Sequence, residues 1–345
     1  MILTIIYAIL IFLILIFVHE TGHLLTAKAT GIRVNEFALG MGPKIFSVQR
    51  GETKYSLRWI PIGGYCAMEG EDEDSDDPRA FGNKPAKVRA LVLFAGSLMN
   101  ILLAIVLLSL IIFSDGEPSR KVETVVETNP VYADGIRPGD EFVSVNNIPV
   151  DNWRDVLKTL NSMIDDSTEE IMVSFAIVRD GSELTIDTHF IRDEAGEFKI
   201  GMSPVYEKSV SYFFKSFGYG ARATVSMTRM MYEVIGDLVT GQAGMDQLTG
   251  PIGIVMTVEE IIPYGMVYVL QLTALISLNL GIVNLLPFPA LDGGRLIFLL
   301  IRKITGKRVT DRIEGIVHMI GIMVLFGFMI LITFQDIGRF ILPGN

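Results

Sequence analysis

The sequence predicts an α-helical polytopic membrane protein with four transmembrane helices, a cytoplasmic membrane-associated β-hairpin and one extracytoplasmic α/β domain. Half of the 345 residues are hydrophobic, and the mean hydropathy is +0.44, which is high for a soluble protein. Apolar residues gather in four long runs, and lysines and arginines gather in two of the segments between them. This composition excludes intrinsic disorder, and the net charge of −10 argues against a basic nucleic-acid binder.

The four apolar runs cover residues 2–18, 88–113, 266–286 and 313–334. A bilayer core requires about 17–25 apolar residues in a helix, so each run is expected to span the membrane. A weaker run at 212–239 mixes aromatic residues with lysine and arginine. This amphipathic pattern is typical of an interfacial helix rather than of a fifth span.

The first run is interpreted as an uncleaved span, with a cleaved signal peptide as the alternative. No basic residue precedes it, and positive charge begins only at Lys28. A signal peptide carries its positive charge before the apolar core. The run also ends in His19 and Glu20, which a signal peptide does not require.

The distribution of lysine and arginine predicts the orientation. Residues 28–89 contain ten of them, and residues 295–312 contain six against one acid. Both segments should therefore face the cytoplasm, which places the two termini and residues 114–265 outside. Residues 114–215 hold ten basic and twenty acidic residues, so the acidic excess of the chain belongs to the outer region.

His19, Glu20 and His23 form an HExxH pattern at the end of the first span. A spacing of four places both imidazoles on one helix face, where they can bind one zinc ion. Glu20 is then placed to take a proton from a water molecule on the metal. The alternative is a polar helix end at the membrane interface, but ionisable residues at such depth are usually functional.

Zinc requires a third protein ligand, and Asp292 is the best candidate. It lies in a glycine-flanked turn after two prolines that end the third span, at the same predicted depth as the HExxH pattern. The alternative role is an N-cap for a helix over 295–304. His189 is expected at the surface of the outer region, and His318 is expected to be a hydrogen-bonded packing residue in the fourth span.

Three asparagines, Asn100, Asn279 and Asn284, lie at membrane depth. Buried amides need partners, so we expect them to bond across helices or to the backbone of a substrate. Asn284 is the preferred candidate for an oxyanion or substrate-orienting group, with helix packing as the alternative.

A β-hairpin is predicted from strands at 44–48 and 54–60 around a turn at 49–52. Next to the zinc helix, the edge of such a strand can pair with an unwound substrate. The alternative is a structural cover over the cytoplasmic face. Gly63 and Gly64 are candidate substrate-binding residues, or they simply permit a tight turn.

An acidic run at 69–77 follows the hairpin and is expected to be a solvated loop, with metal binding as the less favoured role. Cys66, the single cysteine, precedes this run among apolar residues. One cysteine excludes an intrachain disulfide and a cysteine-only metal site, so we interpret Cys66 as a packing residue.

Together, HExxH in the first span and the pattern Asn-x-x-Pro-x-Pro-x-Leu-Asp-Gly from Asn284 resemble the site-2 proteases, which are intramembrane zinc metalloproteases. The resemblance covers almost the whole chain and is closest to the bacterial RseP/RasP-like group. Four further motifs carry this resemblance, at residues 37–43, 60–65, 81–85 and 250–253.

The resemblance implies that His19, His23 and Asp292 bind Zn²⁺ and that Glu20 is the general base. It implies cleavage of single-span membrane proteins near the cytoplasmic side of the bilayer, after a first cut by a site-1 protease in some cases. Anti-sigma factors and signal-peptide remnants are the implied substrates, and the bacterial inner membrane is the implied location. It also assigns the hairpin to substrate handling.

The outer region resembles a PDZ domain of the bacterial protease type, on the basis of the run at 133–150. A helix at 153–163 and strands at 171–178 and 184–190 should follow. Some family members carry two tandem PDZ domains, whereas this chain has room for one. The expected domains are 1–113 with HExxH and the hairpin, 117–205 as PDZ domain, 206–265 as interfacial segment, and 266–345 with the last two spans.

A second functional hypothesis is a non-catalytic membrane scaffold that uses its PDZ domain and carries a degenerate metal site. All four expected catalytic positions are filled, which argues against it. A transporter is disfavoured because no internal repeat is visible and the intramembrane polar residues gather near two spans only.

Overall fold

The computed structural model describes the chain in the ranges 2–71, 73–164, 169–192, 198–242, 244, 248–305 and 311–341. Part of the predicted acidic run (Asp72) and part of the basic segment at 295–312 lie outside these residues. The chain divides into two units, Met1–Ile111 with Phe217–Asn345, and Ile112–Ser216. Each unit is described by itself.

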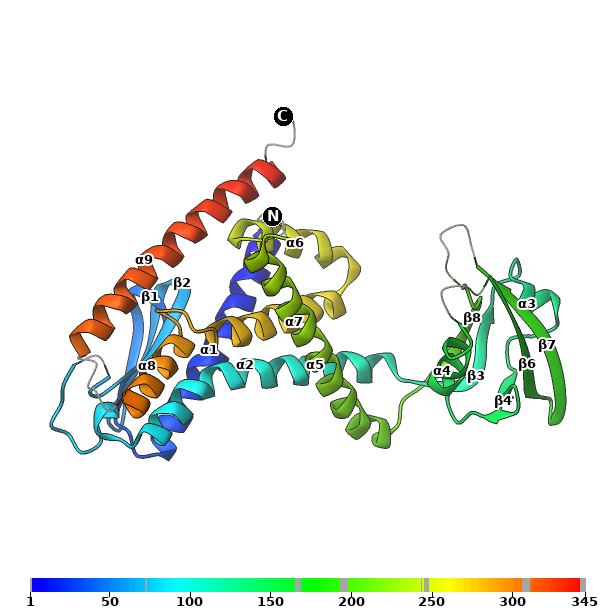
Figure 1. The fold of residues 1–345 in the computed structure, drawn as a ribbon, viewed down its shortest axis with the longest axis horizontal. Coiled ribbons are helices and arrows are strands. Elements are labelled where there is room, and N and C mark those ends of the chain that lie inside the picture. Colours follow the sequence, from blue (N-terminus) through cyan, green and yellow to red (C-terminus); the bar gives the residue numbers. More distant parts are fainter. Residues whose placement is uncertain are drawn as a thin grey trace. The chain divides into compact units, whose positions relative to one another are not determined.

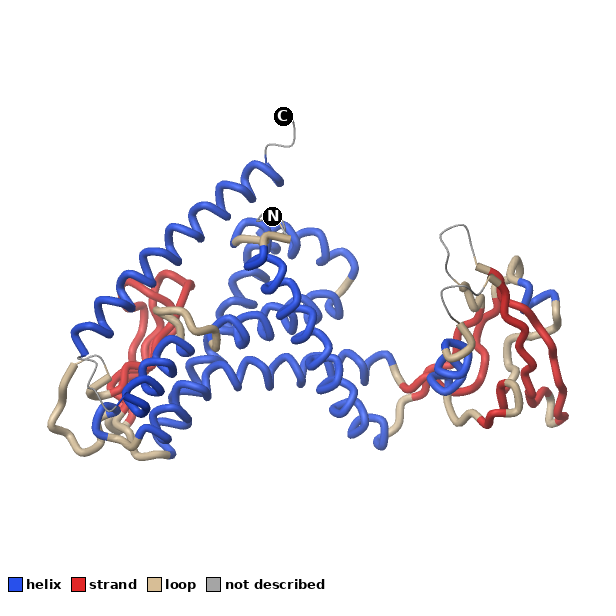
Figure 2. Tube along the Cα trace, in the orientation of Figure 1, coloured by secondary structure: helices blue, strands red, loops and turns tan. Residues whose placement is uncertain are grey.

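Long helices dominate the first unit (Figures 1 and 2). Four helices among the described residues are long and apolar enough to cross a membrane, as the hydropathy of the sequence predicts. They are α1 (Ile2–Ala29), α2 (Ala86–Asp115), α7 (Met266–Asn284) and α9 (Asp311–Asp336). The first helix continues past the predicted end of its span, so the whole HExxH pattern lies within one unbroken helix.

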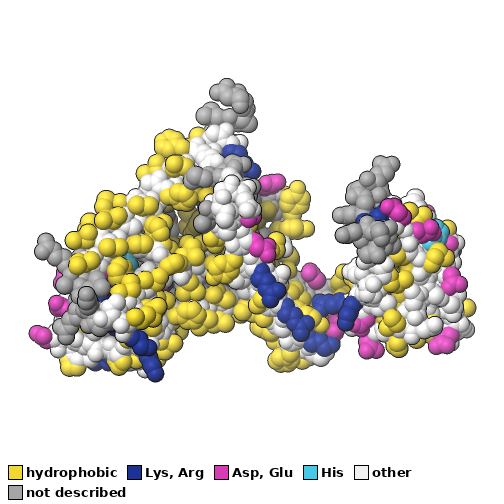
Figure 3. Space-filling view, viewed as in Figure 1, with side chains coloured by type: hydrophobic (Ala, Val, Ile, Leu, Met, Phe, Trp, Pro, Cys, Tyr) yellow, Lys and Arg dark blue, Asp and Glu magenta, His cyan; other side chains and the backbone are white. Residues whose placement is uncertain are grey.

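Further helices lie between and after these spans. The amphipathic run forms α5 (Val210–Thr240), which is not among the four span candidates. The remaining helices of this unit are η1 (Phe81–Asn83), α6 (Pro251–Ile261), η3 (Ile262–Tyr264), α8 (Asp292–Thr305) and η4 (Ile337–Ile341). Hydrophobic side chains cover much of this unit in the space-filling view (Figure 3), as expected for a surface that faces lipid.

The predicted hairpin is present, but its strands are longer than expected. β1 (Val34–Arg50) and β2 (Thr53–Met68) pair antiparallel with several register shifts. Residues 34–39 pair antiparallel with 64–68 on one side, and 36–39 pair with 54–57 in the same chain direction on the other side. Residues 54–57 also pair antiparallel with 46–49. The two strands therefore fold into four short segments, and 64–68 form one edge.

The end of β2 packs against the zinc-binding helix predicted from the sequence. One buried cluster joins α1, the hairpin and α2, and includes Leu24, Phe37, Cys66 and Val92. Cys66 is thus a core residue, as expected, and burial raises the pKa of its thiol. A second cluster joins α1 to α6 and α7 through Leu15, Val258 and Val269.

The second unit is an antiparallel sheet with two short helices. Its strand order is β7-β6-β4-β3-β8, with β5 beside β4. The elements are β3 (Glu117–Val125), α3 (Pro130–Ala133), β4 (Glu141–Val145), β5 (Ile148–Pro149), α4 (Trp153–Asn161), β6 (Glu170–Arg179), β7 (Ser182–Ile191) and β8 (Met202–Glu207). The helix and the two strands expected after the motif at 133–150 lie at α4, β6 and β7.

An aromatic core and one buried ion pair hold the second unit together. Phe142 packs against Phe175 and Trp153 on the covered side of the sheet. Asp140 is fully buried and accepts two hydrogen bonds from Arg179, at 2.6 and 2.7 Å. A third hydrogen bond from the backbone N–H of Arg137 orients the same carboxylate. This network fixes the turn that precedes β4.

Candidate metal centre and active site

The centre is built on one face of α1, where His19 and His23 follow each other by one helical turn. Their Nε2 atoms lie 3.2 Å apart, and both residues are buried. The His23 Nδ1–H donates to the carbonyl of Val92 at 2.9 Å. A carbonyl only accepts, so the proton lies on Nδ1 and the Nε2 lone pair is free for a metal.

Asp292 is the first residue of α8, and its carboxylate lies next to the two imidazoles. Its Oδ2 lies 3.3 Å from His19 Nε2 and 3.5 Å from His23 Nε2. A Cβ added at Gly293 would lie 2.5 Å from the carbonyl carbon of Leu285, and one at Gly294 would lie 3.1 Å from Pro289. The two glycines therefore let the first turn of α8 pack tightly against the segment after α7.

The geometry of these three side chains fits zinc. Tetrahedral zinc with bonds of about 2.0–2.1 Å holds its ligand atoms about 3.3–3.4 Å apart. The three observed separations of 3.2, 3.3 and 3.5 Å match this triangle. Asp292 Oδ2 is buried and has no hydrogen-bond partner among the described residues, and a metal would supply one. Two imidazoles and one carboxylate leave a fourth position open, as catalytic zinc sites do.

Asn100 of α2 lies behind His19. Its side-chain amide is fully buried and approaches His19 Nδ1 at 3.4 Å. The predicted bond between helices is therefore present, and its partner is a predicted metal ligand. An imidazole that binds metal through Nε2 carries its proton on Nδ1, so the amide orientation that serves this centre directs Oδ1 to His19.

A cavity of about 520 Å³ opens beside the three side chains. Glu20, Gly63, Gly64 and Asn284 line it together with the three candidate ligands. Four of the predicted functional positions outside the ligand set thus meet at one place. Asn279 is exposed on α7 and is not among the described residues that line this cavity.

Gly63 and Gly64 belong to β2, at the place where the chain reverses direction between the segments 54–57 and 64–68. A Cβ added at Gly64 would lie 2.7 Å from Ile16 Cγ2 and 3.4 Å from Glu20 Cγ. Gly63 has a φ of 78°, which L side chains rarely adopt. The two glycines therefore allow the edge of the hairpin to lie directly against the predicted catalytic residue.

The acidic run forms a loop in which Glu73, Asp74 and Asp76 are exposed, as expected, but Glu69 and Glu71 are anchored. Hydrogen bonds from Asn35 and Ser75 hold the pKa of Glu69 below its usual range. Glu71 pairs with Arg295 of α8 at 2.5 Å, three residues after Asp292. The run thus contacts the element that carries the third candidate ligand, a long-range contact that local sequence does not reveal.

The two remaining histidines are placed as predicted. His189 lies in the second unit, partly exposed, 3.6 Å from Asp134 Oδ2. His318 is a hydrogen-bonded residue of α9 whose Nδ1 accepts the backbone N–H of Ala290 at 2.8 Å. Sequence reasoning did not identify this partner, which lies two residues before Asp292.

Comparisons with known proteins agree with this geometry. The model of peptidase family M50 matches residues 7–328. A protein of Clostridium acetobutylicum is 36% identical over 335 residues, which covers 96% of this chain and 97% of that protein. The regulator of sigma-W protease RasP of Bacillus subtilis is 31% identical over 424 residues, which covers 98% of this chain and 99% of RasP.

The alignment with RasP is longer than this chain, so RasP contains residues without a counterpart here. A solved PDZ domain of an SdrC-like protein from Listeria monocytogenes matches 26% of this chain and 88% of that domain. It has 17% identity and a TM-score of 0.21. The family match includes the second and third candidate membrane helices, parts of the first and fourth, and every residue of the metal centre. The chain therefore belongs to peptidase family M50, the site-2 protease family, and is a membrane-embedded zinc metalloprotease.

Proposed function

We propose that this protease cleaves the transmembrane segments of single-span membrane proteins within the bilayer. One observation carries the proposal: the HExxH residues lie on a 28-residue apolar helix that is long enough to cross a membrane. A substrate must therefore bring its scissile bond to membrane depth. The family match supports this reading, because the site-2 proteases are intramembrane enzymes.

The proposed roles follow from the placement of each side chain. His19, His23 and Asp292 hold the zinc ion, and Glu20 takes a proton from the attacking water and delivers it to the leaving nitrogen. Zinc, when bound, supplies Lewis-acid polarisation of the scissile carbonyl and lowers the pKa of water. Asn284 lines the cavity and is the candidate to orient the substrate carbonyl.

The substrate is proposed to bind in an extended form along residues 64–68 of β2. This segment forms an edge of the hairpin sheet and lines the metal cavity. A helical peptide bond is shielded by its own hydrogen bonds, whereas an added strand exposes its backbone to the catalytic groups. The tight contact between Gly64 and α1 brings such a strand beside Glu20.

The proposed topology follows from the distribution of positive charge. The active site lies near the cytoplasmic side of a bacterial inner membrane, and both termini and the second unit lie outside. The second unit is proposed to be a single PDZ domain within residues 117–205. Anti-sigma factors and signal-peptide remnants are the proposed substrates, in some cases after a first cut by a site-1 protease. The printed name of the Bacillus relative supports a role in sigma-factor regulation.

The test compares Glu20→Gln with wild type in the full-length protein, with a tagged single-span substrate in the same membranes. Glu20→Gln should abolish cleavage while the purified protein retains one zinc ion per chain. Glu183→Gln, at an exposed position of the second unit, is the matched control and should cleave normally. Full activity in Glu20→Gln would refute the catalytic assignment, and absent zinc in the wild type would favour the scaffold hypothesis.

The natural substrates can be found by comparing membrane proteomes of cells that carry wild type or Glu20→Gln. Membrane stubs that accumulate only with the inactive variant are the expected substrates. If no membrane fragment accumulates, cleavage of transmembrane segments is not the function of this enzyme.

A further inference from the structure

The turn that presents Asp292 has an unusual backbone. Ala290 has a φ of 81°, in the left-handed region that favours glycine. Such a conformation persists only where surrounding contacts hold it. Ala290 lies two residues before Asp292, so its conformation sets where the chain enters α8.

A hydrogen bond from the fourth span holds this residue. The backbone N–H of Ala290 donates to Nδ1 of His318 at 2.8 Å, across 28 residues of sequence. Since the N–H donates, Nδ1 carries no proton, and the ring of His318 acts as the acceptor that this strained turn requires. The turn between α7 and α8 is thus bonded to α9.

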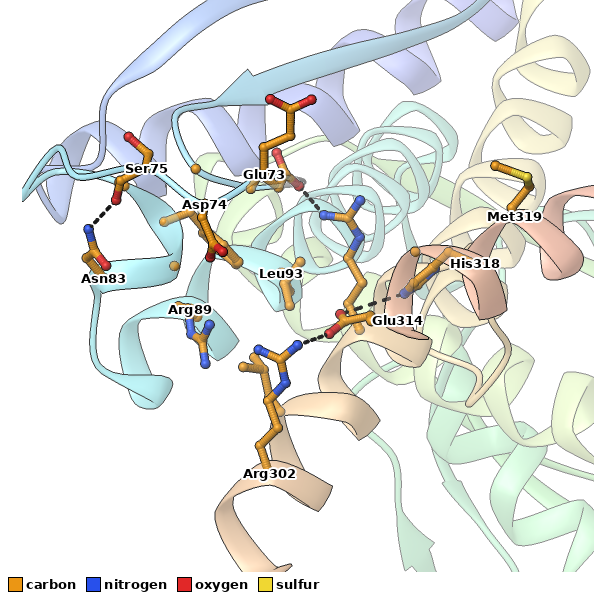
Figure 4. Close-up of a pocket in the computed structure, with 18 of the residues that line it drawn as sticks. Glu73, Asp74, Ser75, Asn83, Arg89, Leu93, Arg302, Glu314, His318 and Met319 are labelled. Carbon is orange, nitrogen blue, oxygen red and sulfur yellow. Dashed lines mark hydrogen bonds and ion pairs between the residues drawn. The ribbon is translucent and has the colours of Figure 1, made fainter. Parts of the chain in front are cut away.

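Three further contacts surround this bond. A Cβ added at Gly321, one turn after His318, would lie 2.5 Å from the carbonyl oxygen of Pro289, so α9 rests directly on the turn. The His318 ring packs against Phe298 of α8 with centroids 5.7 Å apart. Glu314, one turn before His318, pairs with Arg302 of α8 at 2.5 Å (Figure 4). The fourth span therefore contacts the chain both before Asp292, at Pro289 and Ala290, and after it, at Phe298 and Arg302.

We propose that His318 is a positioning residue of the metal centre, which fixes Asp292 by accepting the Ala290 N–H. The inference rests on the proposed role of Asp292 as a zinc ligand. Asp292 Oδ2 lies 3.3 and 3.5 Å from the two imidazole Nε2 atoms, and no hydrogen bond from another described residue holds it. Its position therefore depends on the backbone that carries it. Residues that orient metal ligands commonly change metal affinity by 10–100-fold when they are replaced.

The test uses three replacements in the full-length protein, purified in detergent with zinc bound. His318→Asn keeps an acceptor oxygen at the δ position, His318→Leu keeps similar bulk without an acceptor, and His318→Gln moves the acceptor outward by one carbon. The measurements are the rate of zinc transfer to a chelator and the visible spectrum of the cobalt-substituted protein.

His318→Leu and His318→Gln should release zinc about tenfold faster than wild type and show an altered cobalt spectrum. His318→Asn should stay within a factor of about two to three of wild type, because the acceptor is retained. Wild-type zinc release in His318→Leu would overturn the proposal. Equal impairment of the Leu and Asn variants would also overturn it, because the acceptor would then be irrelevant.

A control separates positioning from a general loosening of α9. Ile332 is buried on the same helix and packs near Gly250, away from the turn. Ile332→Ala should lower the unfolding temperature but leave zinc release unchanged, and faster release in this variant would overturn the proposal. Asp292→Asn distinguishes the two levels of inference. If Asp292→Asn retains zinc, the ligand assignment is refuted. If Asp292→Asn loses zinc but His318→Leu releases zinc at the wild-type rate, only the positioning role of His318 is refuted.

Discussion

Gly96 of α2 lies directly against the imidazole of His23, and no side chain fits between them. A Cβ built at this position would collide with His23 Nε2, and it would also lie 2.9 Å from His19 Cε1. A Cβ built at Gly22 of α1 would likewise lie only 2.9 Å from the Cα of Gly96. Small residues allow membrane helices to approach this closely. The same contact sets the distance between α2 and the metal-binding face of α1.

Gly96→Ala should therefore displace the imidazoles and weaken zinc binding by about 10–100-fold, with a parallel loss of activity. Zinc content after dialysis and cleavage of a tagged substrate measure the effect. Gly327→Ala is the control, because a Cβ at Gly327 meets nothing within 4 Å. Normal zinc binding in Gly96→Ala would show that the centre tolerates a wider helix spacing.

Asn100 should act through the orientation of His19. Asn100→Leu removes the polar group next to Nδ1 and should lower zinc affinity by about tenfold, while the helices still pack. Competition with a chelator of known affinity measures this loss. Ser109→Ala, on the same helix, removes a hydroxyl that donates to the Ile105 carbonyl, and it should have no effect on zinc affinity. Equal affinities for Asn100→Leu and wild type would exclude this role.

Asp336 closes the N-terminus of α6. Its carboxylate is almost fully buried and accepts the backbone N–H groups of Gly250 and Gly253, at 3.2 and 2.8 Å. Asp336→Ala should lower the free energy of unfolding by about 1–3 kcal/mol, because two buried donors lose their acceptor. Thermal unfolding in detergent measures this change. Asp237→Ala, at an exposed position of α5, should leave the unfolding temperature unchanged.

Asp140→Ala should destabilise the second unit without affecting the metal. The variant loses the acceptor for Arg179 and for the Arg137 N–H, which should cost about 2–3 kcal/mol. Fluorescence of the buried Trp153 follows the unfolding of this unit. Asp187→Ala, exposed on β7, is the control, and an equal effect of both substitutions would exclude a special role for the buried pair.

Removal of the metal should both inactivate and destabilise the enzyme. Zinc joins α1 to α8 through its three proposed ligands, and a ligand that binds only the folded state stabilises it by about 4 kcal/mol at 1,000 times its Kd. A chelator should abolish cleavage and lower the unfolding temperature, and added zinc should restore both. If the chelator abolishes cleavage by the wild type but leaves its unfolding temperature unchanged, the metal does not join the two helices.

The sequence by itself determined the features that depend on local pattern. Four apolar runs produced four long helices at the predicted places, because the length of an apolar run is sufficient to identify a membrane span. The pairing of His19 with His23 follows from helical spacing alone. The strands after the motif at 133–150 also appeared where β-rich segments alternate with a turn. These features depend on neighbours within a few residues.

Only the tertiary structure decided which distant residues serve the centre. The position of Asp292 beside the two imidazoles depends on how the chain between His23 and Asp292 folds. The hydrogen bond from the Ala290 N–H to His318 depends on packing between the turn before α8 and the separate helix α9. Asn100 was recognised as a buried amide, but its partner was not predictable. The solvated acidic loop was predicted, but the anchoring of Glu71 was not, because a local charge pattern does not reveal Arg295. Local sequence fixes backbone conformation and hydrophobic faces, whereas packing between helices fixes which polar groups meet.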